Sequence, residues 1–150
     1  MTTSPEETDE FAAAVAELAE PGDLIVLVGG LGAGKTRFVR GFARARGVHE
    51  PVTSPTFALV HVYDASTPVF HADLYRLNSE HEVLDLGLDE ALADGAIGLV
   101  EWGDLASDLL TTERLTVTIR DIDETSRSFE LDGWSDRADA LDHKTRRWQQ

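Results

Sequence analysis

The stretch GGLGAGKT at residues 29–36 constrains the fold of this chain more than any other feature. It matches the pattern G-x-x-x-x-G-K-[ST] through Gly29, Gly34, Lys35 and Thr36. The apolar run LIVLV at 24–28 precedes it and is typical of a strand buried on both faces. The segment 35–47 follows with apolar residues at helical spacing and Gly47 as the expected stop. A strand, a glycine-rich turn and a helix in this order form the context in which the pattern binds phosphates.

The residue types of this turn explain why a nucleoside triphosphate is the expected ligand. Glycines let backbone amides converge on phosphate oxygens, and the start of the helix adds the positive end of its dipole. Lys35 can reach the β- and γ-phosphates, and the Thr36 hydroxyl suits Mg²⁺, which prefers oxygen ligands. The expected nucleotide-binding residues of the turn are Gly30, Leu31, Gly32, Ala33, Gly34, Lys35, Thr36 and Arg37.

Hydrolysis also needs an acid near the metal, and two apolar runs end in one. VFHAD ends at Asp73 and IGLVE ends at Glu101, and either carboxylate could hold Mg²⁺ through water. We expect Lys35, Asp73 and Glu101 to be catalytic, with Thr36 and Glu101 as the metal contacts and Asp73 as the alternative. His71 lies on the same side of its strand as Asp73, and no second histidine is spaced for a metal site, which favours packing or hydrogen bonding.

The remaining elements predict an α/β fold of the P-loop NTPase type, with a mainly parallel sheet flanked by helices and antiparallel strands added. A capping box at Ser4 and Glu7 begins a helix over about 6–19. FALVHVYD and PVFHADLY form a hairpin, and AIGLVEW is a further buried strand. Helices are expected in EVLDLGLDEALAD, divided at Gly87, and in GDLASDLL, and a pair of strands in LTVTIRDIDETSRSFELDG. The 150 residues are expected to form a single domain, with residues 1–5 and about 134–150 unassigned.

Composition and charge narrow the function classes. The chain has no cysteine, which excludes disulfides and thiolate sites, and no segment reads as a signal peptide or membrane span, so a cytoplasmic protein is expected. A formal net charge of -15 argues against independent binding to DNA or RNA. Positive charge is concentrated between Leu24 and His49, which contains no acid, at Lys35, Arg37, Arg40, Arg44 and Arg46. The stripe of Arg37, Arg40 and Arg44 is either a solvated helix face or a docking face.

Two alternatives to an ATPase remain open. A small P-loop kinase would usually carry an arginine-bearing lid, whereas after Glu101 no arginine cluster precedes Arg146 and Arg147. A nucleotide-dependent binding switch would differ from an ATPase in rate rather than in fold. The single asparagine, Asn78, is not part of an N-K-x-D element, so adenine is the expected base.

Five motifs in order, GGLGAGKT, TSPTF, HADLYRL, LGLDE and VEW, resemble the bacterial TsaE family. The resemblance covers residues 4 to about 120. It implies a Mg²⁺-dependent cytoplasmic ATPase, slow when isolated, that works with the TsaB and TsaD proteins to place threonylcarbamoyl on adenosine 37 of tRNA. It implies contact with tRNA only through that complex.

The resemblance also assigns residues. It makes Thr53, Ser54, Pro55, Thr56 and Phe57 a switch loop beside the γ-phosphate. It places Asp73 and Glu101 at the metal and the attacking water, with Trp102 at the edge of the nucleotide site. Two positions depart from the family pattern: Gly30, where an acidic residue is common, and Arg37, where a second threonine often follows.

Overall fold

The computed structural model describes residues 1–30, 33–52, 60–74, 86–101 and 114–149. Its centre is a six-stranded sheet of order β2-β3-β4-β1-β5-β6. The strands are β1 (Leu24–Val28), β2 (Val60–Tyr63), β3 (Val69–Asp73), β4 (Ile97–Glu101), β5 (Arg114–Asp121) and β6 (Arg127–Gly133).

The sheet confirms the predicted α/β class. The four inner strands are parallel, because β3 pairs with β4, β4 with β1 and β1 with β5 in the same direction. The two edge strands, β2 and β6, each pair antiparallel with their neighbour, as hairpin partners do. The phosphate-binding pattern therefore follows a strand in the middle of the sheet. The predicted helix GDLASDLL and the residues before 86 in the Gly87-divided segment lie outside the described residues.

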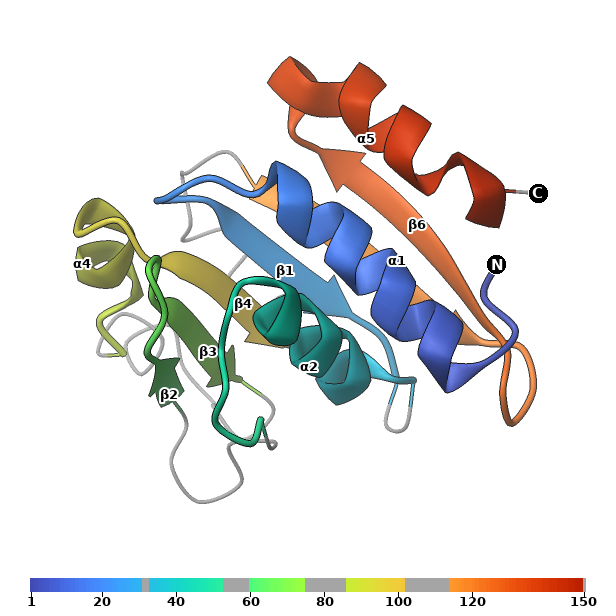
Figure 1. The fold of residues 1–150 in the computed structure, drawn as a ribbon, viewed down its shortest axis with the longest axis horizontal. Helices are drawn as coiled ribbons and strands as arrows, with labels where there is room; N and C mark the ends of the chain where they lie inside the picture. The colour runs from blue at the N-terminus through green and yellow to red at the C-terminus, as the bar shows by residue number, and fades with distance from the viewer. Residues whose placement is uncertain (31–32, 53–59, 75–85, 102–113, 150) are drawn as a thin grey trace.

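The helices lie against both faces of the sheet. They are α1 (Pro5–Leu18), α2 (Lys35–Ala45), α4 (Leu88–Ala93) and α5 (Ala138–Thr145), with 3₁₀ turns η2 (Ser135–Arg137) and η3 (Arg146–Trp148). Helices α1 and α2 run side by side over one face (Figure 1). Their apolar residues join alternate residues of the inner strands in one core, which includes Phe11, Phe38, Leu27 and Leu99. The other face of the inner strands packs with Leu88 and Leu92 of α4 in a second core.

Local signals explain where these helices begin and end. Ser4 caps α1, because its Oγ accepts from the Glu7 amide at 3.1 Å. The return half of the expected capping box differs, since the Glu7 carboxylate accepts from the amide of Thr3, at 2.7 Å, rather than from that of Ser4. Helix α2 stops at the predicted glycine: Gly47 has φ +90°, and the Val48 amide donates to the Ala43 carbonyl at 3.0 Å.

The chain ends, which the sequence left unassigned, also pack on the sheet. Thr2 pairs with Arg127 on the outer edge of β6. Residues 138–145 form α5 beside β6 and α1 (Figure 1), and Trp148 packs edge-on against Phe11 with ring centroids 5.4 Å apart. Within the described ranges, no helix has the length and apolar character needed to cross a membrane.

Candidate nucleotide-binding site

The phosphate-binding pattern lies where strand β1 leads into helix α2, between the ends of β4 and β5. Gly34 precedes the helix in a left-handed conformation, φ +103° and ψ 18°, that other residues rarely adopt. No side chain caps this end of α2, and its first intrahelical bond runs from the Phe38 amide to the Gly34 carbonyl at 3.0 Å. The first turn of an eleven-residue helix thus keeps the anion-binding character that helix starts possess.

Lys35 folds back over the turn that precedes it. Its Nζ donates to the carbonyls of Gly29 and Gly30, both at 2.8 Å, and only 5% of the residue is exposed. Burial lowers the pKa of Lys35 below its ordinary value, while the negative charges of Glu101 and Asp73 act in the opposite direction. Because folding lowers this pKa, the native state holds the proton less tightly, and the stability from this group rises with pH between the two pKa values.

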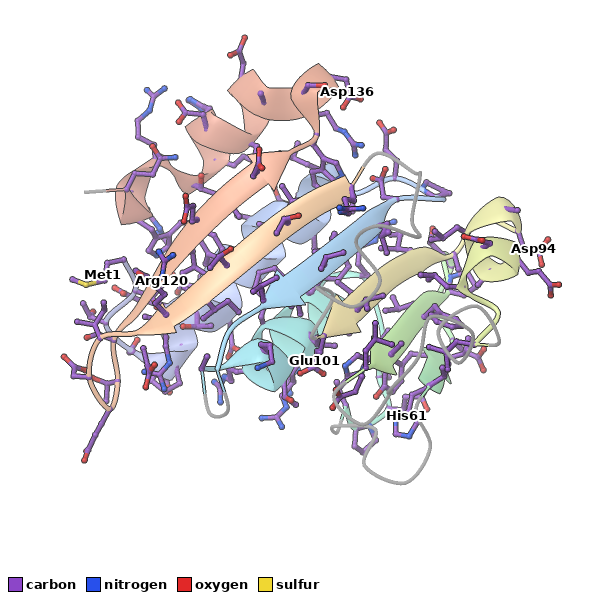
Figure 2. The ribbon with its side chains drawn as sticks, turned by 180° about the vertical axis from the view of Figure 1, so that it is seen from behind. Met1, His61, Asp94, Glu101, Arg120 and Asp136 are labelled. Atoms are coloured by element: carbon purple, nitrogen blue, oxygen red, sulfur yellow. The ribbon has the colours of Figure 1, made fainter. Side chains whose placement is uncertain are left out.

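The two strand-end acids come together on the face of the sheet that carries α2. Asp73 and Glu101 are direct partners in the β3–β4 register, and Glu101 is 2% exposed at the end of β4 (Figure 2). The Thr36 hydroxyl lies 3.4 Å from Glu101 Oε1, a long hydrogen bond. Two oxygen atoms that could bind a metal ion, from residues 65 positions apart in the sequence, therefore face one another near Lys35.

His71 contacts the other oxygen of the Glu101 carboxylate. Its Nε2 lies 2.5 Å from Glu101 Oε2, and the ring is fully buried and stacked on Tyr63 with centroids 6.2 Å apart. Since a carboxylate only accepts, we assign the Nε2–H tautomer to His71. Its Nδ1 has no hydrogen-bond partner in the described part of the chain. These contacts agree with the packing or hydrogen-bonding role that the sequence favours for His71, and the hydrogen bond orients the Glu101 carboxylate.

The arginine stripe of α2 does not behave as one surface. Arg37 reaches across to α1 and donates from Nε and Nη2 to the two carboxylate oxygens of Asp9, at 2.7 and 2.6 Å. This hydrogen-bonded carboxylate raises the pKa of Arg37. Arg40 and Arg44 instead border a surface pocket with residues 48–52. The side chain of Arg37 thus packs helix α2 against α1.

Some predicted site residues are not described by the structure. Leu31 and Gly32 of the turn, the switch-loop residues Thr53, Ser54, Pro55, Thr56 and Phe57, and Trp102 all lie outside the described residues. One neighbour of the turn was missed by the sequence analysis. Arg127 contacts the carbonyl of Ala33 from 94 residues away, and an arginine after a polar turn carries no motif that announces this.

The residues present fit both parts of a Mg-nucleotide. Thr36 and Glu101 offer oxygen atoms only, with Asp73 alongside, which is the donor chemistry that Mg²⁺ selects. Gly34 and the uncapped start of α2 suit phosphate oxygens, and Lys35 supplies the positive charge.

Gly29 and Gly30 differ in what a side chain would meet, and this gives a matched pair of variants. A Cβ at Gly29 would lie 2.7 Å from the Ile119 carbonyl oxygen and 3.0 Å from Ala33 Cβ, whereas a Cβ at Gly30 has nothing within 4 Å. We expect Gly29→Ala to lose about 1–3 kcal/mol of unfolding free energy, and Gly30→Ala to change it by less than about 0.5 kcal/mol. Urea unfolding of both variants measures this; equal losses would show that the close approach to β5 does not restrict the turn.

Fold and site together define the class. A central parallel strand that ends in G-x-x-x-x-G-K-[ST] and leads into a helix, with acids ending the neighbouring strands, is the architecture of P-loop NTPases. The family model for "Threonylcarbamoyl adenosine biosynthesis protein TsaE" matches residues 2–129. The chain belongs to the TsaE family.

Individual relatives agree with this placement. The chain is 40% identical over 141 residues to the tRNA threonylcarbamoyladenosine biosynthesis protein TsaE of Bacillus subtilis, covering 93% of this chain and 88% of that one. It is 42% identical over 114 residues to the TsaE protein of Streptomyces coelicolor, covering 73% and 76%. The crystal structure of YdiB from Bacillus subtilis superposes with a TM-score of 0.78 at 36% identity, over 97% of this chain and 91% of that one.

Proposed function

We propose that this protein binds ATP with Mg²⁺ on the turn 29–36 and hydrolyses it slowly, in support of threonylcarbamoylation of adenosine 37 in tRNA. The observation that carries the proposal is the position of Glu101. Its carboxylate lies between the Thr36 hydroxyl and the buried His71, on the strand adjacent to the one that leads into the phosphate-binding turn. An acid in this place, together with a P-loop lysine, is what metal-assisted phosphoryl transfer requires.

Each residue has a separate task in this proposal. Backbone amides of the turn and of the start of α2 bind phosphate oxygens, and Lys35 moves from the Gly29 and Gly30 carbonyls to the phosphates. Thr36 and Glu101 would hold the metal, and His71 keeps the Glu101 carboxylate oriented. Asp73 orients the attacking water. Bound Mg²⁺ supplies neutralisation of the charge on the β- and γ-phosphates.

The proposed partners are the TsaB and TsaD proteins, with tRNA contacted through their complex. A net charge of -15 opposes direct association with a polyanion, and it argues equally against DNA as a ligand. We propose that residues 53–57, the predicted switch loop, change conformation with the γ-phosphate and that a partner protein recognises this change. A cytoplasmic location and the single-domain organisation remain predictions of the sequence.

Reconstituted tRNA modification tests the proposal. We expect that repeated rounds of threonylcarbamoyl transfer by TsaB and TsaD require this protein and ATP. We also expect that the isolated protein turns ATP over slowly and binds tRNA poorly. Modification that proceeds equally well without the protein would overturn its role in the pathway. Transfer of phosphate from ATP to a metabolite, with no effect on tRNA modification, would establish a kinase instead, and nucleotide-dependent assembly without turnover would establish a switch.

A further inference from the structure

One contact of the turn at residues 29–36 comes from the β5–β6 hairpin at the edge of the sheet. Arg127, the first residue of β6, donates from Nε to the carbonyl oxygen of Ala33 at 3.0 Å. Its Nη1 donates to the carbonyls of Asp123 and Ser126, at 2.7 and 2.9 Å. One guanidinium thus joins the turn of the β5–β6 hairpin to the residue that precedes Gly34.

The arginine is itself firmly held. Its backbone exchanges two hydrogen bonds with Thr2, at 2.8 and 2.9 Å, so the N-terminal segment pairs with it on the outer edge. The hairpin turn is shaped by Asp123, whose Oδ1 accepts from the amides of Thr125 and Ser126 at 2.9 and 2.8 Å. The carbonyls that receive Nη1 are therefore fixed in place. A planar guanidinium with its donors in a rigid fork transmits that position to the Ala33 carbonyl.

The direction of the Ala33 carbonyl decides the direction of the next amide. The structure has no cis peptide bonds in its described ranges, and in a trans peptide the C=O and the following N–H point in opposite directions. When Arg127 holds the Ala33 oxygen on its own side, the Gly34 N–H is turned to the opposite side. Gly34 then leads into α2 in its left-handed conformation. A Cβ added at Gly34 would lie 3.6 Å from Arg127 Nε. A flip of this peptide would replace a donor by an oxygen in the phosphate cradle.

We propose that Arg127 is a positioning residue of the phosphate-binding turn, which fixes the Ala33–Gly34 peptide so that the Gly34 amide faces bound phosphate. It acts through the backbone and touches no phosphate itself. This inference rests on the proposed nucleotide-binding function. The β5–β6 hairpin lies on the other side of β1 from the strands that carry Asp73 and Glu101. The inference means that this hairpin contributes to nucleotide affinity.

The test compares Arg127→Met and Arg127→Lys with the control Arg120→Met. Arg120 belongs to the same hairpin (Figure 2). It makes an ion pair with Glu130 at 3.4 Å, and both side chains are about two thirds exposed. We expect Arg127→Met to raise the KM and the calorimetric Kd for Mg-ATP about tenfold, the loss typical of a hydrogen bond to a charged group, with kcat changed less than about threefold. Arg127→Lys, which keeps one donor and the charge, should lie between that variant and the wild type. Arg120→Met should match the wild type.

The outcomes separate the inference from the function on which it rests. If the wild type does not bind Mg-ATP, the proposed function fails. If it binds, and the Arg127 variants lose thermal stability but keep the wild-type KM, the arginine serves the fold alone and the inference is overturned. If Arg127→Met does not fold, Arg127→Lys decides the question by the same comparison of KM with thermal stability.

Discussion

Lys35→Ala is expected to lower ATP turnover by about 100-fold or more and to weaken ATP binding at least about tenfold. The variant removes the only lysine of the site, a buried ammonium that lies within hydrogen-bonding reach of the turn and close enough to Glu101 and Asp73 for their charges to oppose its pKa shift. Lys35 is proposed to place that charge against the β- and γ-phosphates, where the surroundings exclude water and strengthen it. Isothermal calorimetry and a phosphate-release assay measure the two effects.

The chain supplies its own control, since Lys144 is the other lysine. Lys144 forms an exposed ion pair with Glu17 between α5 and α1, and exposed ion pairs contribute little to the free energy of unfolding. We therefore expect Lys144→Ala to keep wild-type affinity and turnover. Thermal unfolding of both variants should show folded proteins. Unchanged ATP affinity in folded Lys35→Ala would refute the assignment of the phosphate-binding turn.

Glu101→Gln is expected to reduce kcat about 100-fold while ATP affinity changes less than about threefold. Glutamine keeps the shape of the side chain, its amide oxygen can accept from His71 Nε2–H, and its NH₂ group can donate to the Thr36 hydroxyl oxygen, so both buried contacts can be kept. What disappears is the negative charge proposed to hold Mg²⁺, and the concentration of Mg²⁺ needed for half-maximal turnover should rise. Titration of turnover with Mg²⁺ at saturating ATP measures this.

Asp73→Asn serves as the companion variant and Glu130→Gln as the control. Asp73 lies beside Glu101 in the register, so comparing their Mg²⁺ requirements tells which acid holds the metal. The acid whose amide variant needs the larger increase in Mg²⁺ concentration for half-maximal turnover is the metal ligand, and the other acid is assigned to the attacking water. Glu130 is exposed on β6, and we expect Glu130→Gln to keep the wild-type turnover and Mg²⁺ requirement. Wild-type turnover in both Asp73→Asn and Glu101→Gln would remove the acids from the mechanism.

Much of the candidate nucleotide-binding site follows from local sequence. The strand at 24–28 was predicted with its observed bounds because a continuous apolar run bounded by turn residues has few alternatives. Ser4, Gly34 and Gly47 act on their own neighbours, so caps and turns can be read from the sequence. The helix predicted over 6–19 was displaced by one residue, since Pro5 already suits the first helical position.

The tertiary structure decided which distant residues meet. Strand order sets Asp73 beside Glu101 and His71 against its carboxylate, and nothing in the residues between them encodes that order. Arg37 reads as part of a solvated stripe until packing of α1 on α2 brings Asp9 within reach. Helix α5 was not predicted because it depends on packing against the rest of the molecule, where Leu141 joins the buried core, rather than on its own sequence pattern. The sequence by itself determined the backbone conformation of the turn suited to phosphate, since that conformation depends on adjacent residues. Only the tertiary structure brought Glu101, His71 and Arg127 to their partners, because these contacts join residues 30 to 94 positions apart.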